Sequence, residues 1–454
     1  MIQQLTTRMI ALALLALTLG GCASDQPKTV KHVILISLDG SRPEFYLDPS
    51  WHTPNLRKFM EKGVYSKEGV KSVFPSFTYP SHTAMVTGAL PIHHGIYNNT
   101  PYDGVRGQWL SDAKDIQSPT LWDAVQAAGM TSGAVMWPVT VGAPIDYNFP
   151  ERFPMEGEED KDVLTIKYPY VQPKSLLTDI EQATGTPFTA DDLSTKKNFN
   201  EAKTITLIAN YIIKKYKPNL MGIHMIAMDH QEHAHGTDAP EVRAAVQITD
   251  SLIGTIIQTV KAAGIWENTA VIFIGDHGHA NTMASFAPNV YLAQHGLIKG
   301  KEWKAKFYAA GGSSFLYLKD KNDQALVDSV AGILKQSPEF KAGAFRILDR
   351  EALDTMGAAT NTQLGIAMKE GFTVRNGATG KTFTEKDGST STHGYDPNYK
   401  SMYTAFIAAG PGIARHKEIE GMCVTDIAPL VARLLNLDFD APDGHLPAGL
   451  FADE

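Results

Sequence analysis

Three segments of the chain are almost continuously hydrophobic, and each ends close to an aspartate. The segments cover residues 30–38, 220–228 and 270–274, and the aspartates that follow them are Asp39, Asp229 and Asp276. Apolar runs of this length without alternation are typical of parallel strands that are buried on both faces of a sheet. The pattern therefore predicts a parallel sheet with an acidic residue near the end of three of its strands.

Helical periodicity appears between the second and third of these strands. Apolar residues at Val242, Val246, Ile253, Ile257 and Val260 fall on one helical face, and Gly264 follows near the end. A strand, a helix and a strand in this order form a βαβ unit. A further strand is expected at 403–409 and a closing helix at 426–435. The fold class is thus α/β, a doubly wound and mostly parallel sheet covered by helices on both faces.

Two stretches interrupt this alternation. Residues 151–200 are charged, contain proline and are weakly periodic, as expected of an insertion over one face. Residues 300–390 contain short strand-like pieces at 314–319 and 345–348 and a glycine-rich part at 371–388. We expect one domain over 31–450, in which the second insertion forms a small subdomain or cap.

The first residues have the features of an export signal. Arg8 precedes an apolar run at 10–19 that is too short to span a bilayer, and Leu19-Gly20-Gly21-Cys22 resembles a bacterial lipobox. Residues 1–22 are then a signal peptide, Cys22 is lipid-modified, and residues 23–30 form a tether. Ala23 after the cysteine favours a periplasmic protein anchored in the outer membrane. The alternative is an ordinary secretory signal with a chance cysteine.

Composition and charge narrow the partners. The 454 residues are 43% hydrophobic and 20% charged, with a formal net charge of −8. The acidic balance argues against binding a nucleic-acid polymer, which requires a basic stripe. A small anionic substrate remains compatible, because a metal site attracts it locally. No second apolar segment is long enough to span a membrane, so we expect membrane contact only through the lipid anchor.

The aspartates predict a metal site. Ligands of open α/β sheets bind beyond the carboxyl ends of the strands, and three carboxylates meeting there repel one another unless cations neutralise them. A single such aspartate is more often a turn or helix cap. His233 follows Asp229 by four residues, His277 follows Asp276 directly, and His393 comes from a distant loop. Oxygen and nitrogen ligands without thiolates suit zinc, and also manganese or iron. The spacing leaves open whether His230, His233 or His235 binds the metal.

A candidate nucleophile lies in Phe74-Pro75-Ser76-Phe77-Thr78-Tyr79-Pro80-Ser81-His82. Pro80 marks the first turn of a helix that stops near Gly88. Thr78 then stands at a helix N-terminus, where free backbone N–H groups favour phosphate. Coordination to a divalent metal would lower the pKa of its hydroxyl. The alternative role of Thr78 is that of a plain helix cap.

Seven ordered motifs resemble those of the nucleotide pyrophosphatase/phosphodiesterase family, which belongs to the alkaline phosphatase superfamily. They cover roughly residues 31–440 and are Ser37-Leu38-Asp39-Gly40, Thr78-Tyr79-Pro80-Ser81-His82, Val86-Thr87-Gly88, His94-Gly95-Ile96, Asp229-x3-His233-x2-Gly236, Asp276-His277-Gly278 and Thr392-His393-Gly394-Tyr395. The resemblance implies hydrolysis of phosphodiester or pyrophosphate bonds in small, nucleotide-like substrates.

The resemblance also implies a role for each residue. One Zn²⁺ would be held by Asp229, His233 and His393. The second Zn²⁺ would be held by Asp39, Asp276 and His277, with Thr78 as nucleophile. Thr78 would form a phospho-threonine ester, and Asn99 would donate to a non-bridging phosphate oxygen. His230 and His235 fall outside the ligand positions.

Two departures from the family pattern concern the pocket. His224 occupies the position where many members have a tyrosine that stacks on a nucleobase. Gly275 and His279 flank Asp276-His277 in place of the more usual serine and methionine. Tyr79 keeps the base-stacking position beside the nucleophile, and Tyr168 or Tyr170 would supply a second aromatic wall.

Other functions of such a metal site require different residues around it. Alkaline phosphatases pair a serine with a nearby arginine, whereas the nearest arginine downstream of Thr78 is Arg106. A sulfatase would need a Cys or Ser in a C/S-x-P-x-R motif, which the sequence lacks. A phosphomonoesterase and a choline or lipid phosphodiesterase remain alternatives on the same metal site. A non-catalytic zinc-binding lipoprotein would leave Thr78 and Asn99 without a role.

The lipid anchor can be tested directly. A Cys22→Ala variant lacks the thiol that accepts the lipid, so we expect it to leave the membrane fraction and appear in the soluble periplasmic fraction. Fractionation followed by immunoblotting measures this distribution. A variant that still sediments with membranes would show that Cys22 is not the anchor.

Overall fold

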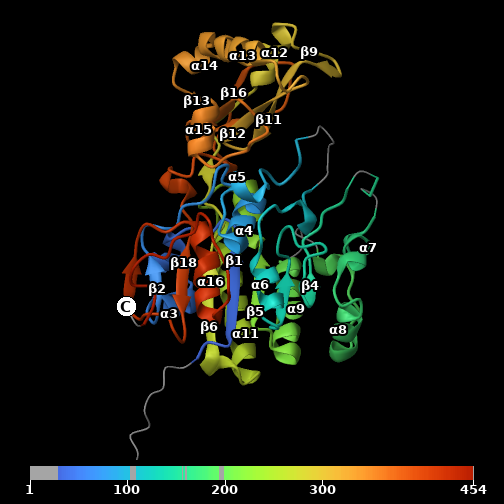
Figure 1. Ribbon diagram of the computed structural model, residues 1–454, viewed down its shortest axis with the longest axis vertical. Helices are drawn as coiled ribbons and strands as arrows, with labels where there is room; N and C mark the ends of the chain where they lie inside the picture. Colours follow the sequence, from blue (N-terminus) through green and yellow to red (C-terminus); the bar gives the residue numbers. More distant parts are fainter. Residues whose placement is uncertain (1–28, 103–108, 156, 159–160, 194–198, 453–454) are drawn as a thin grey trace, which may run out of the picture.

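The computed structural model describes residues 29–102, 109–155, 157–158, 161–193 and 199–452. Figure 1 shows a large α/β body and a smaller lobe that stands above one edge of its sheet. No helix in the described ranges is both long and apolar enough to cross a bilayer.

The body is built on a sheet of eight strands in the order β19-β2-β18-β6-β1-β5-β3-β4. Strand β18 runs antiparallel to both of its neighbours, and all other adjacent pairs are parallel. The strands are β1 (His32–Leu38), β2 (Val64–Ser66), β3 (Ser132–Val135), β4 (Tyr147–Phe149), β5 (Leu220–Met225), β6 (Thr269–Ile274), β18 (Phe406–Ala409) and β19 (Lys417–Ile419). The expected fold class is confirmed.

The three predicted apolar strands are β1, β5 and β6, with β1 between the other two. Helix α11 (Pro240–Ala262) connects β5 to β6, as expected for the βαβ unit. Two details differ from the prediction. The strand expected to reach residue 228 ends at Met225, so that Asp229 lies in the first turn of α10 (Ala227–His235). The strand expected at 403–409 is shorter and is the antiparallel member of the sheet.

Alternate residues of β1 pack against different layers of helices. Ile34 and Ile36 belong to the core cluster on one face, and Val33 and Leu35 belong to the cluster on the other. The first face is covered by α3 (Pro54–Met60), α9 (Asn200–Tyr216) and α11, and the second by α4 (Thr78–Thr87), α6 (Leu121–Ala127) and α16 (Ile427–Leu435). Each of these four side chains is fully buried, which stabilises the fold by about 1.5–3 kcal/mol per residue. The sheet is therefore held rigidly from both sides.

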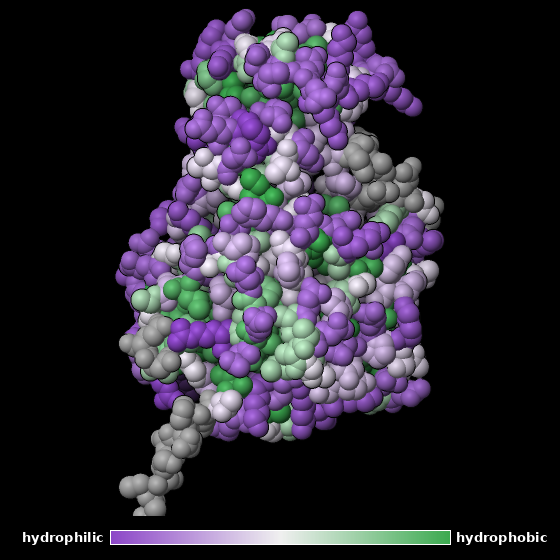
Figure 2. All heavy atoms as spheres, in the orientation of Figure 1, coloured by the Kyte–Doolittle hydropathy of each residue, from purple (hydrophilic) through white to green (hydrophobic). Residues whose placement is uncertain are grey.

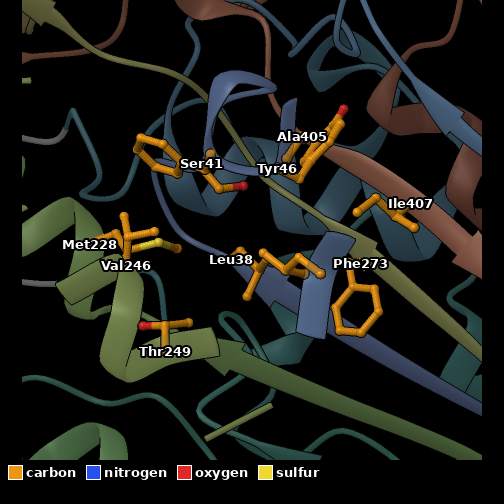
Figure 3. Close-up of a pocket in the computed structure, with 11 residues that line it drawn as sticks. Leu38, Ser41, Tyr46, Met228, Val246, Thr249, Phe273, Ala405 and Ile407 are labelled. Carbon is orange, nitrogen blue, oxygen red and sulfur yellow. The ribbon is translucent and has the colours of Figure 1, made fainter. Parts of the chain in front are cut away.

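A narrow gap remains within the first of these layers, beneath the carboxyl end of β1. Figure 3 shows Leu38, Met228, Val246 and Phe273 around it, and Tyr46 and Ala405 also line it. Its lining is almost wholly apolar, so this gap is a feature of core packing.

The lobe contains a four-stranded antiparallel sheet in the order β11-β12-β14-β13. The strand-like pieces predicted at 314–319 and 345–348 are β12 (Ser313–Leu318) and β13 (Phe345–Leu348); the other two strands are β11 (Ala305–Ala310) and β14 (Gly365–Met368). Helices α12 (Pro288–Gln294) and α13 (Gln324–Gln336) pack over this sheet with their own apolar cluster. The glycine-rich part supplies β15 (Phe372–Val374) and β16 (Phe383–Glu385), which flank β8 (Ala284–Phe286). This second core makes the lobe a distinct packing unit above the sheet edge.

The described part of residues 151–200 lies at the β4 side of the body, where α7 (Val163–Lys167) and α8 (Leu176–Thr184) form its outer edge in Figure 1. The buried side chains Leu176, Leu177 and Ile180 of α8 join the same apolar cluster as α9. This stretch is therefore anchored to the body by a helix with an apolar face.

Candidate active site

The predicted metal ligands converge at the carboxyl edge of the sheet, between the body and the lobe. Asp39 follows β1, Asp276 and His277 follow β6, and Asp229 and His233 belong to α10. His393 follows β17 (Ser391–Thr392), which pairs with β7 (Ala280–Asn281). Segments more than 300 residues apart in sequence thus meet at one place.

Three groups of described side chains have the spacing that a metal ion requires: one combines His82, His224 and Asp276, and the other two contain predicted histidine ligands. In the first of these two, ligand atoms of Asp39, Asp276 and His277 lie within 4.8 Å of one another. In the second, the same holds for Asp229, His277, His279 and His393. The His277 and His393 rings stack with their centroids 3.6 Å apart, so the two groups are adjacent. His233 borders the second group, because its Nε2 lies 3.3 Å from Asp229 Oδ1.

The first group contains two buried carboxylate oxygens that no described donor reaches. His277 Nε2 lies 3.4 Å from Asp39 Oδ1 and 3.2 Å from Asp276 Oδ2. Both oxygens are buried and lack a hydrogen-bond partner among the described residues. Burial and the neighbouring carboxylates raise the pKa of Asp39 well above its usual value, and burial raises the pKa of Asp276 to about 6. Two buried acceptors without donors fit a bound cation.

The histidines are held with Nε2 pointing inward. The Nδ1–H of His233 donates to the Ser391 carbonyl at 3.0 Å, that of His277 to the Gly278 carbonyl at 3.2 Å and that of His393 to the Ser76 carbonyl at 2.9 Å. A backbone carbonyl accepts only, so each bond places the hydrogen on Nδ1 and leaves the Nε2 lone pair free. Metal-binding histidines in proteins are usually oriented in this way.

Electrostatics keeps two of these imidazoles neutral, which is the form that binds metal. Burial, together with a neighbouring imidazole, lowers the pKa values of His277 and His393 well below the ordinary value. His233 differs: burial alone would lower its pKa, but the charge and hydrogen bond of Asp229 raise it to about 9. A cation beside Asp229 would displace that proton, because metal ligands bind deprotonated. The donor set of buried carboxylates and imidazoles without thiolates fits divalent cations, zinc among them.

The other two histidines of α10 do not join these groups. His235 is exposed at the last residue of the helix, whereas His230 and His233 are both half-buried. His233 Nε2 lies 3.3 Å from Asp229 Oδ1, so this contact favours His233 among the three histidines as the candidate ligand.

Thr78 is the first residue of α4, which ends at Gly88 as predicted. Its Oγ1 lies 3.3 Å from His277 Nε2. Since the Nδ1 of that ring carries the hydrogen, the hydroxyl faces a free nitrogen lone pair at the edge of the first metal-capable group. The threonine is thus placed beside the predicted ligands, in the position expected of a nucleophile.

Asn99 lies next to the first turn of this helix. Its Oδ1 accepts the Tyr79 N–H at 2.9 Å, which orients the amide and leaves its NH₂ group as the donor. The Tyr79 N–H is therefore occupied and Pro80 has none, so these two positions of the first turn offer no free N–H to a phosphate, and the Asn99 NH₂ group is a donor beside them.

The aromatic residues expected to contact a base are placed differently. The Tyr79 ring is 0% exposed and packs with Ile96 and Val139, so the prediction that it stacks on a ligand is wrong for this conformation. The Tyr168 hydroxyl lies 3.4 Å from Glu181 Oε1 within the 151–200 stretch. Its predicted role, and that of Tyr170, stay predictions.

His224 links the Asp39 side chain to Glu151. It is fully buried, with Nε2 3.1 Å from Asp39 Oδ2 and Nδ1 2.9 Å from Glu151 Oε2. Burial alone would lower the pKa of His224, but its hydrogen bonds to the two carboxylates raise the pKa well above the ordinary value. His224, which departs from the family tyrosine, thus contacts Asp39 directly in this chain. Glu151 carries no motif and was missed by the sequence analysis.

Comparison with known proteins agrees with this geometry. The family model described as type I phosphodiesterase / nucleotide pyrophosphatase matches residues 33–396. The human ectonucleotide pyrophosphatase/phosphodiesterase family member 5 is 27% identical, over 94% of this chain and 79% of its own length. Its solved structure superposes with a TM-score of 0.66 at 22% identity and covers 91% of this chain and 97% of that chain.

Two mouse proteins extend the comparison. Mouse bis(5'-adenosyl)-triphosphatase enpp4 is 24% identical, over 94% of this chain and 82% of its own length. A solved structure of murine ectonucleotide pyrophosphatase/phosphodiesterase 5, an inactive threonine-to-alanine variant in complex with AMP, has a TM-score of 0.64 at 21% identity and covers 91% of this chain and 97% of that chain. With the family model matching most of its length, the chain belongs to the type I phosphodiesterase/nucleotide pyrophosphatase family of hydrolases.

Proposed function

We propose that this protein hydrolyses phosphodiester or pyrophosphate bonds of small, nucleotide-like substrates with two zinc ions and Thr78 as nucleophile. One observation carries the proposal. The Thr78 hydroxyl lies 3.3 Å from the nitrogen of His277 that also approaches the two unpartnered oxygens of Asp39 and Asp276. A hydroxyl at the edge of such a group is placed to act as a metal-activated nucleophile.

Two sets of residues would hold the metals. Asp39, Asp276 and His277 form one set beside Thr78, and Asp229, His233 and His393 form the other. When bound, two divalent cations lower the pKa of a coordinated hydroxyl and stabilise the charge that develops on the attacking and leaving oxygens.

The reaction would then proceed in two steps at Thr78, with Asn99 binding the phosphate. Thr78 Oγ forms a bond to phosphorus as the bond between phosphorus and the leaving oxygen breaks, giving a phospho-threonine ester. The Asn99 NH₂ group, fixed by the Tyr79 N–H, donates to a non-bridging oxygen. Water then cleaves the bond between Oγ and phosphorus, releasing a phosphate monoester and restoring the hydroxyl.

The preference for nucleotides has support from the relatives. The name of the mouse enpp4 protein gives a dinucleoside triphosphate as its substrate, and the murine family member 5 variant holds AMP. The burial of Tyr79 removes one expected base contact. For this reason diesters of choline or lipids remain the second candidate substrates.

We also propose export and lipid attachment at Cys22, which would place the enzyme in the periplasm at the outer membrane. The signal peptide and Cys22 fall within residues 1–28, outside the described residues. Their support is the lipobox-like sequence alone.

The role of Thr78 has a direct test. Thr78→Ala removes the attacking oxygen, so we expect kcat to fall at least about 1,000-fold. Thr78→Ser keeps a hydroxyl and should retain a larger part of the activity. Zinc content, measured by atomic emission, should remain the same in both variants. Activity in Thr78→Ala close to that of the unmodified protein would contradict the assignment.

The reaction class is tested by a panel of substrates. Bis-p-nitrophenyl phosphate, p-nitrophenyl phosphate and p-nitrophenyl thymidine monophosphate report diester, monoester and nucleotide diester cleavage respectively. We expect the highest kcat/KM for the nucleotide diester and the lowest for the monoester. Faster cleavage of the monoester would contradict the diesterase proposal, and indifference to the nucleoside would favour the choline or lipid diesters.

Metal dependence separates His233 from its neighbours. A chelator should abolish turnover, and added Zn²⁺ should restore it. His233→Ala should lose one of two zinc equivalents, because its Nε2 faces Asp229. The matched control His235→Ala changes an exposed histidine of the same helix and should keep both equivalents. Equal zinc binding by the two variants would remove His233 from the ligand set.

A further inference from the structure

We propose that His279 is a further ligand of the cation that Asp229 holds, an inference that rests on the proposed two-metal function. His279 Nε2 lies 2.8 Å from Asp229 Oδ1. The same oxygen is 3.3 Å from His233 Nε2 and 3.8 Å from His393 Nε2. His279 is therefore nearer to this carboxylate than either predicted histidine ligand.

The backbone explains why His279 reaches this position. Strands β7 and β17 form an antiparallel ribbon in which Ala280 pairs with Thr392. His279 precedes Ala280 and His393 follows Thr392, so the antiparallel register places the two histidines opposite each other. Their ring centroids are 5.2 Å apart, and the His233 ring lies 4.9 Å from that of His279. The ribbon that delivers one predicted ligand thus delivers a second imidazole to the same place.

The hydrogen bonds of His279 settle which ring nitrogen carries hydrogen. Ser391 Oγ donates its hydrogen to the Glu232 carbonyl at 2.6 Å. It therefore accepts from His279 Nδ1, which lies 3.0 Å away. This is the arrangement found for His233, His277 and His393, whose Nδ1–H groups donate to backbone carbonyls. All four imidazoles share the orientation of metal-binding histidines.

With hydrogen on Nδ1, the contact between His279 Nε2 and Asp229 requires either a second ring proton or a shared cation. A lone pair and a carboxylate oxygen 2.8 Å apart repel each other unless a proton or a metal lies between or beside them. Protons on the rings that surround this oxygen would put several positive charges in a site where His279 is 2% exposed. One divalent cation satisfies Asp229 and every facing nitrogen with neutral rings, so the geometry favours ligation over protonation.

The consequence is a more enclosed cation site than the three predicted ligands would give. An additional protein ligand leaves fewer positions for water and increases metal retention. His279 thereby affects the affinity of one of the two proposed sites and leaves the site of Asp39, Asp276 and His277 unchanged.

The test measures metal binding by the full-length protein. Apo-protein is titrated with Zn²⁺ in competition with a chromophoric chelator, and imidazole ligands are counted by X-ray absorption at the zinc edge. His279→Met removes the ring nitrogen, and His279→Gln keeps an amide N–H that can still donate to Asp229. We expect both variants to bind one of two zinc equivalents at least about 100-fold more weakly, with fewer imidazoles per zinc. Ser391→Ala keeps the His279 ring but removes the hydroxyl that accepts its Nδ1–H and donates to the Glu232 carbonyl, and it should weaken the same equivalent about 10-fold.

The control is His295→Met, because His295 is an exposed histidine after α12 and its Nδ1 is bonded to the Tyr291 carbonyl. It should bind both equivalents like the unmodified protein. Unchanged binding in both His279 variants would overturn the proposal, and so would retention by His279→Gln with loss by His279→Met, which indicates a hydrogen-bond donor. An unmodified protein that binds two zinc ions but cleaves no ester would contradict the proposed function without affecting this assignment.

Discussion

The central constraint on this structure is the meeting of three buried carboxylates at one edge of a sheet. Ligand atoms of Asp39, Asp276 and His277 lie within 4.8 Å of one another. At such a separation two like charges repel by about 3 kcal/mol even with an effective dielectric constant near 20. The fold imposes this proximity because β1 and β6 are adjacent parallel strands whose carboxyl ends point the same way. Cations bound there, as proposed, would neutralise the cluster and remove this repulsion.

Hydrogen bonds from the Nδ1–H groups to backbone carbonyls decide how the candidate histidine ligands are oriented. The carbonyls of Ser76, Gly278 and Ser391 each accept an Nδ1–H from a histidine of the site. These carbonyls belong to the loop before α4, the turn after β6 and strand β17. The orientation of the candidate ligands is therefore coupled to the packing of segments that are distant in sequence, and loss of one anchor would reorient a ring without removing it.

The lobe and the body meet close to the carbonyls that anchor these histidines. Gly394 follows His393, and its N–H donates to the Ser76 carbonyl at 2.9 Å. Its φ of +84° is a conformation that other residues rarely adopt. An added Cβ there would overlap the Ala310 carbonyl of β11 and the Phe77 ring. The glycine thus lets the loop that carries His393 pass between the lobe and the N-terminus of α4, which couples the position of the lobe to the geometry of the candidate site.

The sequence by itself determined the central strands, the α11 crossover and the residues near the strand ends. Apolar runs and short motifs are local signals, and buried parallel strands need little else to be recognised. Local spacing could not decide among His230, His233 and His235, because all three lie on one short helix; only packing against β17 turned His233 inward. The position of Tyr79 beside Thr78 suggested a ring that contacts a base, yet the first turn of α4 directs this ring into the core. The contacts of Glu151 with His224 and of His279 with Asp229 were decided by the tertiary structure, because neighbouring residues specify neither the contact between the β4 and β5 segments nor the register of the β7–β17 ribbon.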